Sequence, residues 1–143
     1  MMAWVVDTCA LLDIMEGIPP FAELAAEGLD EKAKEGPLAI APITYVELAP
    51  AFNGDRAMQD LFLRNVGASI DFGGDEETVV AAHKAWHEHI LRKHSGAEKK
   101  RPIADIMIGA YAMHKDGLIT RNEADFRSLY PNLKIFNSVS SAT

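Results

Sequence analysis

The sequence contains little cysteine, few aromatic residues and fewer basic than acidic residues. Its 143 residues include one cysteine, and aromatic residues make up 8% of the chain. A single cysteine excludes an intramolecular disulfide and suits a reducing compartment such as the cytoplasm. There are 14 lysine and arginine residues against 21 aspartate and glutamate residues, which gives a formal net charge of −7. This balance is unusual for a protein that binds nucleic acid, because a basic surface normally binds the phosphate backbone.

Long apolar runs without charge are also missing. No stretch reaches the roughly 18 residues that a membrane helix requires. The N-terminal apolar run is interrupted by Asp7 and lacks the basic start of a signal peptide. We therefore expect a cytoplasmic protein with no membrane association. Because 48% of the residues are hydrophobic, the chain can bury one substantial core. We expect a single domain over residues 1–137 and a flexible C-terminal tail over residues 138–143.

Short apolar, β-prone runs alternate with helix-like stretches along the chain. Strands are expected at 3–7, 38–41, 68–72, 117–119 and 133–136. Helices are expected at 8–16, 20–35, 56–66, 75–93, 102–116 and 123–129, with a further helix around Glu47 that begins at Pro42 or Thr44. This alternation predicts an α/β fold, a three-layer α/β/α sandwich with a central, mainly parallel sheet.

Four segments place an acidic residue where a predicted strand ends or a predicted helix begins. The segments are VVDTCALL, PITYVELA, RPIADIMIGAYA and LITRNEADF, and their acids are Asp7, Glu47, Asp105 and Asp125. Asp7 follows the first strand directly, and ligands of open parallel sheets bind outside the carboxyl ends of strands. Each acid also has a structural explanation. Asp7 or Thr8 is suited to cap the next helix, and Asp105 suits the first turn of a helix.

Two of these acids lie in strongly apolar surroundings, which makes a purely structural role harder to accept. Burying an unpaired carboxylate costs several kcal/mol, so Glu47 and Asp105 need a partner or an exposed position. Clustered carboxylates also repel one another, whereas Mg²⁺ and Mn²⁺ take carboxylate oxygens as ligands. Together the four acids predict a site for one or two Mg²⁺ or Mn²⁺ ions.

With these motifs in this order, the sequence resembles the PIN-domain ribonucleases, and more narrowly the VapC-type toxins of toxin–antitoxin pairs. The resemblance covers essentially the whole chain and rests on four motifs, which contain Asp7 and Thr8, Glu47, Asp105, and Thr120 with Asn122 and Asp125. It implies a PIN-like fold and metal-dependent hydrolysis of phosphodiester bonds in tRNA, rRNA or mRNA. It also implies inhibition by a cognate VapB-like antitoxin and a homodimer as the usual unit.

The resemblance also implies roles for individual residues. Asp7, Glu47 and Asp105 would be catalytic metal ligands, with Thr8 and Thr120 hydrogen-bonded to ligands. Many relatives carry an aspartate where Asn122 stands, so the remaining ligand is either Asp125 or the amide of Asn122. Both alternatives stay open at this point, and so does capping of the helix 123–129 by Thr120 or Asn122.

Basic residues near these motifs are candidate RNA contacts. Lys99, Lys100 and Arg101 directly precede the Asp105 helix, and Arg121 lies within LITRNEADF. A solvated loop explains the first group equally well, and an exposed structural role explains Arg121. The resemblance assigns no role to the segment 71–101, which is longer and more charged than a minimal domain of this family needs.

Two other functions compete with the nuclease. An aspartyl-phosphate phosphatase also has an aspartate after its first strand, but it usually needs a second acid two residues later, where this chain has Cys9. A catalytically degenerate domain that only binds RNA or protein is the other alternative, and Asn122 favours it. Cys9 itself is expected to be a small buried residue of the first helix rather than a nucleophile.

Overall fold

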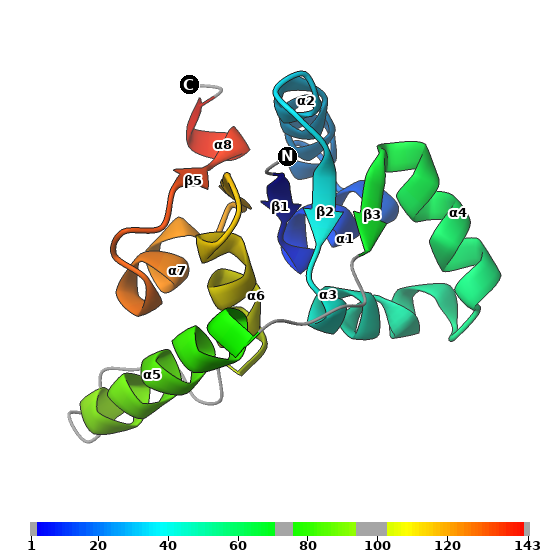
Figure 1. Ribbon diagram of the computed structural model, residues 1–143. Coiled ribbons are helices and arrows are strands. Elements are labelled where there is room, and N and C mark those ends of the chain that lie inside the picture. Colours follow the sequence, from blue (N-terminus) through cyan, green and yellow to red (C-terminus); the bar gives the residue numbers. More distant parts are fainter. Residues whose placement is uncertain (1–2, 71–75, 94–102, 142–143) are drawn as a thin grey trace.

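A computed structural model describes residues 3–70, 76–93 and 103–141 of the chain (Figure 1). Over these ranges one sheet contains β1 (Trp4–Val6), β2 (Leu38–Ile40), β3 (Ala68–Ile70), β4 (Gly117–Ile119) and β5 (Ile135–Phe136). The strand order is β3-β2-β1-β4-β5, and every neighbouring pair is parallel. The predicted α/β fold with a central parallel sheet is therefore confirmed.

Helices account for most of the remaining described residues. They are α1 (Thr8–Glu16), α2 (Phe21–Ala33), α3 (Pro42–Glu47), α4 (Arg56–Val66), α5 (Glu76–Lys93), α6 (Ile103–Met113), α7 (Glu123–Leu129) and α8 (Ser138–Ser141), with one 3₁₀ helix, η1 (Ala49–Phe52). Within the described ranges, no helix combines the length and the apolar character needed to cross a membrane.

The sheet separates two hydrophobic cores, which makes the molecule a three-layer sandwich. Side chains alternate along each strand, so Trp4 and Val6 lie in one core and Val5 lies in the other. The Trp4 side also buries residues of α1, α2 and α4, and the Val5 side buries residues of α5, α6 and α7. Figure 1 shows these two groups of helices on opposite sides of the strands.

The strand order creates a switch point between β1 and β4. From β1 the chain proceeds to β2 and β3 on one side, and it later returns to β4 and β5 on the other. The amide of Asp7 donates to the carbonyl of Ile119 at 3.0 Å, so the residues that follow β1 and β4 lie next to each other. Open α/β sheets bind their ligands at such a switch point.

Several elements are shorter than predicted, and backbone hydrogen bonds explain two of these differences. The helix expected over 102–116 ends at Met113, because the amides of His114 and Lys115 donate to carbonyls three residues earlier and form a tight turn. The last strand begins at Ile135 rather than 133, because the amide of Leu133 donates to the carbonyl of Tyr130 in a turn. The 3₁₀ helix η1 was not expected.

Residues 138–141 form a short helix where the sequence predicts part of a flexible tail. The side-chain oxygen of Asn137 accepts hydrogen bonds from the amides of Val139 and Ser140 at 3.1 and 3.3 Å, and so caps α8. α8 packs against α2, where Gly28 permits the close approach of Ser138. The division of the chain into a domain and a tail stays a prediction.

Candidate active site

Asp7 is the central residue of the candidate site. It follows β1 at the switch point and is 3% exposed. Although Asp7 occupies the N-cap position of α1, its side chain makes no capping hydrogen bond to that helix. One carboxylate oxygen, Oδ2, instead accepts from the Thr120 hydroxyl at 2.7 Å and from the Cys9 thiol at 3.0 Å. The capping explanation for Asp7 is therefore wrong, because the carboxylate is directed toward β4.

The turn after β4 is built around the Thr120 hydroxyl. Thr120 is 1% exposed, and its Oγ1 donates to Asp7 while accepting from the backbone amide of Asn122 at 3.0 Å. This second bond determines the direction in which the hydroxyl hydrogen points. Asn122 stands at the N-cap position of α7, yet its side chain makes no capping bond either. Thr120 thus links the turn to Asp7.

The environment of Asp7 disfavours its ionised form. Burial raises the pKa of the Asp7 carboxyl, and the negative charge of Asp105 raises it further. Hydrogen bonds from Cys9 and Thr120 act in the opposite direction, but the pKa stays above its ordinary value. A nearby cation would reverse this balance, because it stabilises the carboxylate more strongly than the acid.

Glu47 reaches this region through a hydroxyl. It is the last residue of α3, and its Oε1 accepts from the Thr8 hydroxyl at 2.7 Å. The Thr8 oxygen also lies 3.0 Å from the hydroxyl oxygen of Thr44, which is fully buried. The Glu47 carboxylate is therefore fixed to the residue that follows Asp7. Its side chain is exposed, so the burial cost that the sequence suggested for Glu47 does not arise.

Asp105 lies in the first turn of α6 and is half-buried. The helix packs against β1 and against α3, which carries Glu47. Asp105 is close enough to Asp7 for its charge to affect the pKa of that residue. Asp125, in contrast, lies exposed in the first turn of α7.

The described residues contain no group of three or more histidine, cysteine, aspartate and glutamate side chains spaced to hold a metal ion. The four predicted acids therefore do not form a complete protein cage. A magnesium ion needs fewer protein ligands than such a cage provides, since it commonly keeps several waters and binds through one or two carboxylates. Asp7 and Asp105 are the two acids that could serve as such a pair, since the charge of Asp105 acts on Asp7 and burial makes the Asp7 charge costly without a cation. The residues present fit a hydrated divalent ion.

Cys9 contributes a hydrogen bond rather than a nucleophile. Burial, together with the charge of Asp7 and the hydrogen bond to it, raises the pKa of the Cys9 thiol to about 12. The thiol is therefore protonated at neutral pH and donates to Asp7. Its sulfur also lies 3.6 Å from the Thr120 hydroxyl oxygen.

Arg121, a candidate RNA contact, forms an ion pair with an acid of α1. Its Nε and one terminal nitrogen donate to the two carboxylate oxygens of Asp13 at 2.7 and 3.2 Å. The guanidinium also stacks over the ring of Phe21, 4.5 Å from the ring centre. The sequence analysis missed Asp13, a 6% exposed acid within the apolar stretch CALLDIM. The burial argument used for Asp105 applies equally to Asp13 and would have found it.

The other basic candidates, Lys99, Lys100 and Arg101, lie outside the described residues.

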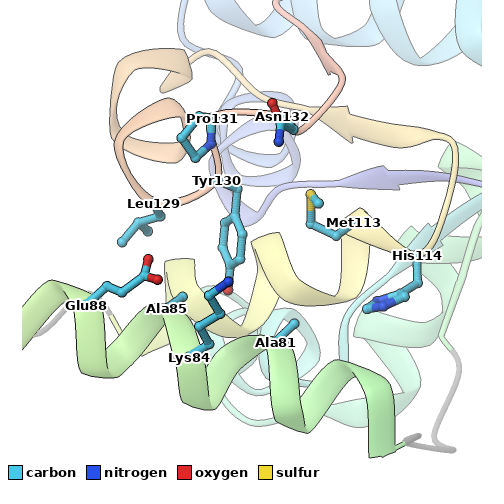
Figure 2. Close-up of a pocket in the computed structure, with 10 residues that line it drawn as sticks. All are labelled: Ala81, Lys84, Ala85, Glu88, Met113, His114, Leu129, Tyr130, Pro131 and Asn132. Carbon is cyan, nitrogen blue, oxygen red and sulfur yellow. The ribbon is translucent and has the colours of Figure 1, made fainter.

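A separate pocket of about 280 Å³ lies at the far end of α6. Figure 2 shows the Tyr130 ring between α6 and the chain after α7, with Met113 and His114 on one side and Glu88 of α5 on the other. Met113 is eight residues from Asp105 along the helix, about 12 Å at 1.5 Å per residue. None of the predicted site acids lines this pocket, so it is distinct from the candidate site.

No protein-family model and no curated protein sequence matches the chain. The structure, however, is similar to several solved ones. A chain of VapBC2 from Rickettsia felis, bound to a DNA fragment from their promoter, is 20% identical with a TM-score of 0.70, over 95% of this chain and 98% of that one. A chain of VapBC-1 from nontypeable Haemophilus influenzae is 19% identical with a TM-score of 0.69, over 96% and 99% of the two chains.

A toxin–antitoxin complex from Klebsiella pneumoniae also contains a similar chain. That chain is 20% identical with a TM-score of 0.61, over 95% of this chain and 98% of its own length. At such identities the likeness shows the fold, and it confirms the PIN-like fold that the motifs predicted.

Proposed function

We propose that this chain is a metal-dependent endoribonuclease and the toxin of a toxin–antitoxin pair. The observation that carries the proposal is the Asp7 carboxylate, which is buried at the switch point, held on one oxygen by Thr120, and close to the charge of Asp105. A buried acid with a perturbed pKa and a specific charged neighbour is typical of functional sites. The fold likeness to chains of toxin–antitoxin complexes supports the biological role.

In this proposal the acids have different roles in binding metal. Asp7 and Asp105 would hold one Mg²⁺ or Mn²⁺ ion, Glu47 would be a third carboxylate, and Asp125 or Asn122 would be needed only for a second ion. When bound, the ion lowers the pKa of a coordinated water and offsets negative charge on the scissile phosphate. The hydroxyls of Thr8 and Thr120 keep oxygens of Glu47 and Asp7 in fixed positions.

The remaining parts of the proposal concern partners and location. We infer an RNA substrate, a VapB-like antitoxin, a homodimer and a cytoplasmic location. Two of the similar structures are VapBC complexes, and the third is a toxin–antitoxin complex, which supports an antitoxin partner. Light scattering of the purified chain, alone and mixed with a candidate antitoxin, measures the oligomeric state and the complex.

The decisive experiment is cleavage of total cellular RNA by the purified, antitoxin-free chain in Mg²⁺, Mn²⁺ or EDTA. We expect discrete fragments that need metal and that disappear with Asp7→Asn and Asp105→Asn. The matched control is Asp30→Asn, which removes an exposed carboxylate on α2 and should cleave normally. Intact RNA under every condition, from correctly folded protein, would contradict the nuclease.

A degenerate binding domain is the second candidate, and two features favour it. The described residues lack a three-ligand group, and Asn122 stands where many relatives carry an aspartate. In that case RNA or a protein partner would bind with equal affinity in EDTA and in Mg²⁺, and no fragments would form. Metal-dependent cleavage excludes this alternative.

A further inference from the structure

The Asp13–Arg121 ion pair joins two parts of the chain that are distant in sequence. Asp13 lies near the end of α1 and its side chain is 8% exposed, whereas Arg121 follows β4 and its side chain is 36% exposed. The two nitrogens of Arg121 meet both carboxylate oxygens of Asp13, a bidentate arrangement that fixes orientation as well as distance. Phe21, the first residue of α2, covers one face of the guanidinium.

Each residue of this ion pair is connected to Asp7 through a short part of the structure. On one side Arg121 is the neighbour of Thr120, whose hydroxyl holds Asp7 and accepts the amide of Asn122. On the other side α1 begins directly after Asp7 and runs as one helix to Asp13 and beyond. The contacts therefore close a ring from Asp7 through α1 to Asp13, across to Arg121, and through Thr120 back to Asp7.

Closure of this ring restricts the turn after β4. The amide of Asn122 reaches the Thr120 hydroxyl only while residues 120–122 keep their present conformation. Arg121, in the middle of these three residues, is held by Asp13 and Phe21. Without these contacts the turn would lose two of the constraints on its middle residue, and the direction of the Thr120 hydroxyl would be less well defined.

We propose that Arg121 and Asp13 are positioning residues, which fix Thr120 and thereby the Asp7 carboxylate, and that Arg121 is not an RNA contact. The inference rests on the proposed function for its kinetic part only. Two N–H donors of the Arg121 guanidinium bind a buried carboxylate, and one face lies against an aromatic ring. Its position is therefore determined by Asp13 and Phe21 rather than by a phosphate.

The test measures amide hydrogen exchange of Asn122 by NMR in the metal-free full chain, and kcat and KM for RNA cleavage in Mg²⁺. The main variant is Arg121→Lys, which keeps the charge beside Asp13 but loses the planar fork and the stacked face. Asp13→Asn is the second variant, and Arg64→Lys, an exposed arginine of α4, is the matched control. Thermal melting identifies a variant that fails to fold. If Asp13→Asn does not fold, the results for Arg121→Lys alone decide between the two roles of Arg121.

We expect Arg121→Lys to accelerate exchange of the Asn122 amide at least tenfold and to lower kcat at least tenfold, with KM changed less than twofold. The control should leave all three quantities unchanged. An RNA contact predicts the opposite pattern, in which KM rises and depends less on salt while kcat and exchange stay constant. That pattern, or unchanged exchange in both variants, overturns the proposal.

Failure of the proposed function is distinguishable from failure of this inference. If the wild-type chain cleaves no RNA in any metal, the nuclease proposal fails, but exchange of the Asn122 amide is still measurable. Faster exchange in Arg121→Lys would then support the positioning role, and unchanged exchange would refute it.

Discussion

Without metal, Asp7→Asn should be more stable than wild type. With metal, wild type should be the more stable of the two. Burial raises the pKa of Asp7, the charge of Asp105 adds to this, and hydrogen bonds from Cys9 and Thr120 compensate only in part. The folded protein therefore disfavours the ionised form relative to the unfolded chain. In EDTA at neutral pH, Asp7→Asn removes this cost and should stabilise the fold.

The size of the effect follows from two opposing contributions. A buried polar group without full compensation costs about 1–3 kcal/mol. Asparagine keeps an acceptor oxygen for Thr120, but a neutral acceptor makes a hydrogen bond about half as strong as a charged one. A net gain on the order of 1 kcal/mol remains, which corresponds to a melting temperature about 2–4 °C higher for a domain of this size.

Metal should change this order. Wild type in Mg²⁺ at 100 times its dissociation constant should gain about 2.7 kcal/mol, whereas Asp7→Asn should gain almost nothing. Differential scanning fluorimetry in EDTA and in Mg²⁺ measures both differences, with Asp30→Asn as the control that should follow wild type. A variant that melts below wild type in EDTA, or an equal gain in Mg²⁺, would refute the reasoning.

The pH dependence in EDTA has a definite sign. Since the folded pKa of Asp7 is raised, its contribution to stability is fully present below the unfolded pKa and is lost as pH rises through the folded pKa. The stability advantage of Asp7→Asn should therefore shrink when the pH is lowered through that folded pKa. An advantage that grows in acid would show that another group is responsible.

Further predictions concern the neighbours of Asp7. Thr120→Val should lower the free energy of unfolding in urea by about 1–3 kcal/mol, because it leaves the Asn122 amide without its acceptor. It should also lower RNA cleavage at least tenfold, whereas Thr120→Ser should stay close to wild type in both measurements. Cys9, with its pKa of about 12, should react with iodoacetamide at pH 8 at least ~100-fold more slowly in the folded chain than in urea; equal rates would contradict the buried thiol. Asn122→Asp adds a carboxylate and should tighten Mn²⁺ binding in calorimetry, and unchanged affinity would place residue 122 outside the metal site.

The order and type of most elements could be predicted from the sequence because each carries its own local signal. Trp4–Val6 is a short β-prone run that ends at a polar pair, and Gly117–Ile119 is a short apolar run that follows a helical stretch. Parallel pairing of the strands then follows from their alternation with helices. The α8 helix was missed because its cap, Asn137, lies in a stretch of small polar residues that otherwise resembles a tail.

The composition of the candidate site was harder to predict than the fold. Asp7, Asp105 and Thr120 follow from their places at strand and helix ends, but the Asp13–Arg121 pair connects residues 108 positions apart. No local pattern specifies that pairing, and a basic side chain next to predicted metal ligands favours an RNA contact when only sequence is considered. The three-dimensional structure shows that the arginine already has a buried partner.

The contacts of Asn122 show what an asparagine, in place of an aspartate, provides at that position. Asn122 contributes its backbone amide to the Thr120 hydroxyl, and any residue except proline can make this bond. An asparagine therefore preserves the contact that orients Asp7 while it removes one negative charge. With Asp125 exposed on α7, the carboxylate whose charge acts on Asp7 is that of Asp105 on α6, and this pair supports our proposal of one hydrated ion rather than two. The backbone amide of residue 122 helps to position Asp7 through Thr120, whatever its side chain. The side chain of residue 122 determines only the charge of the turn.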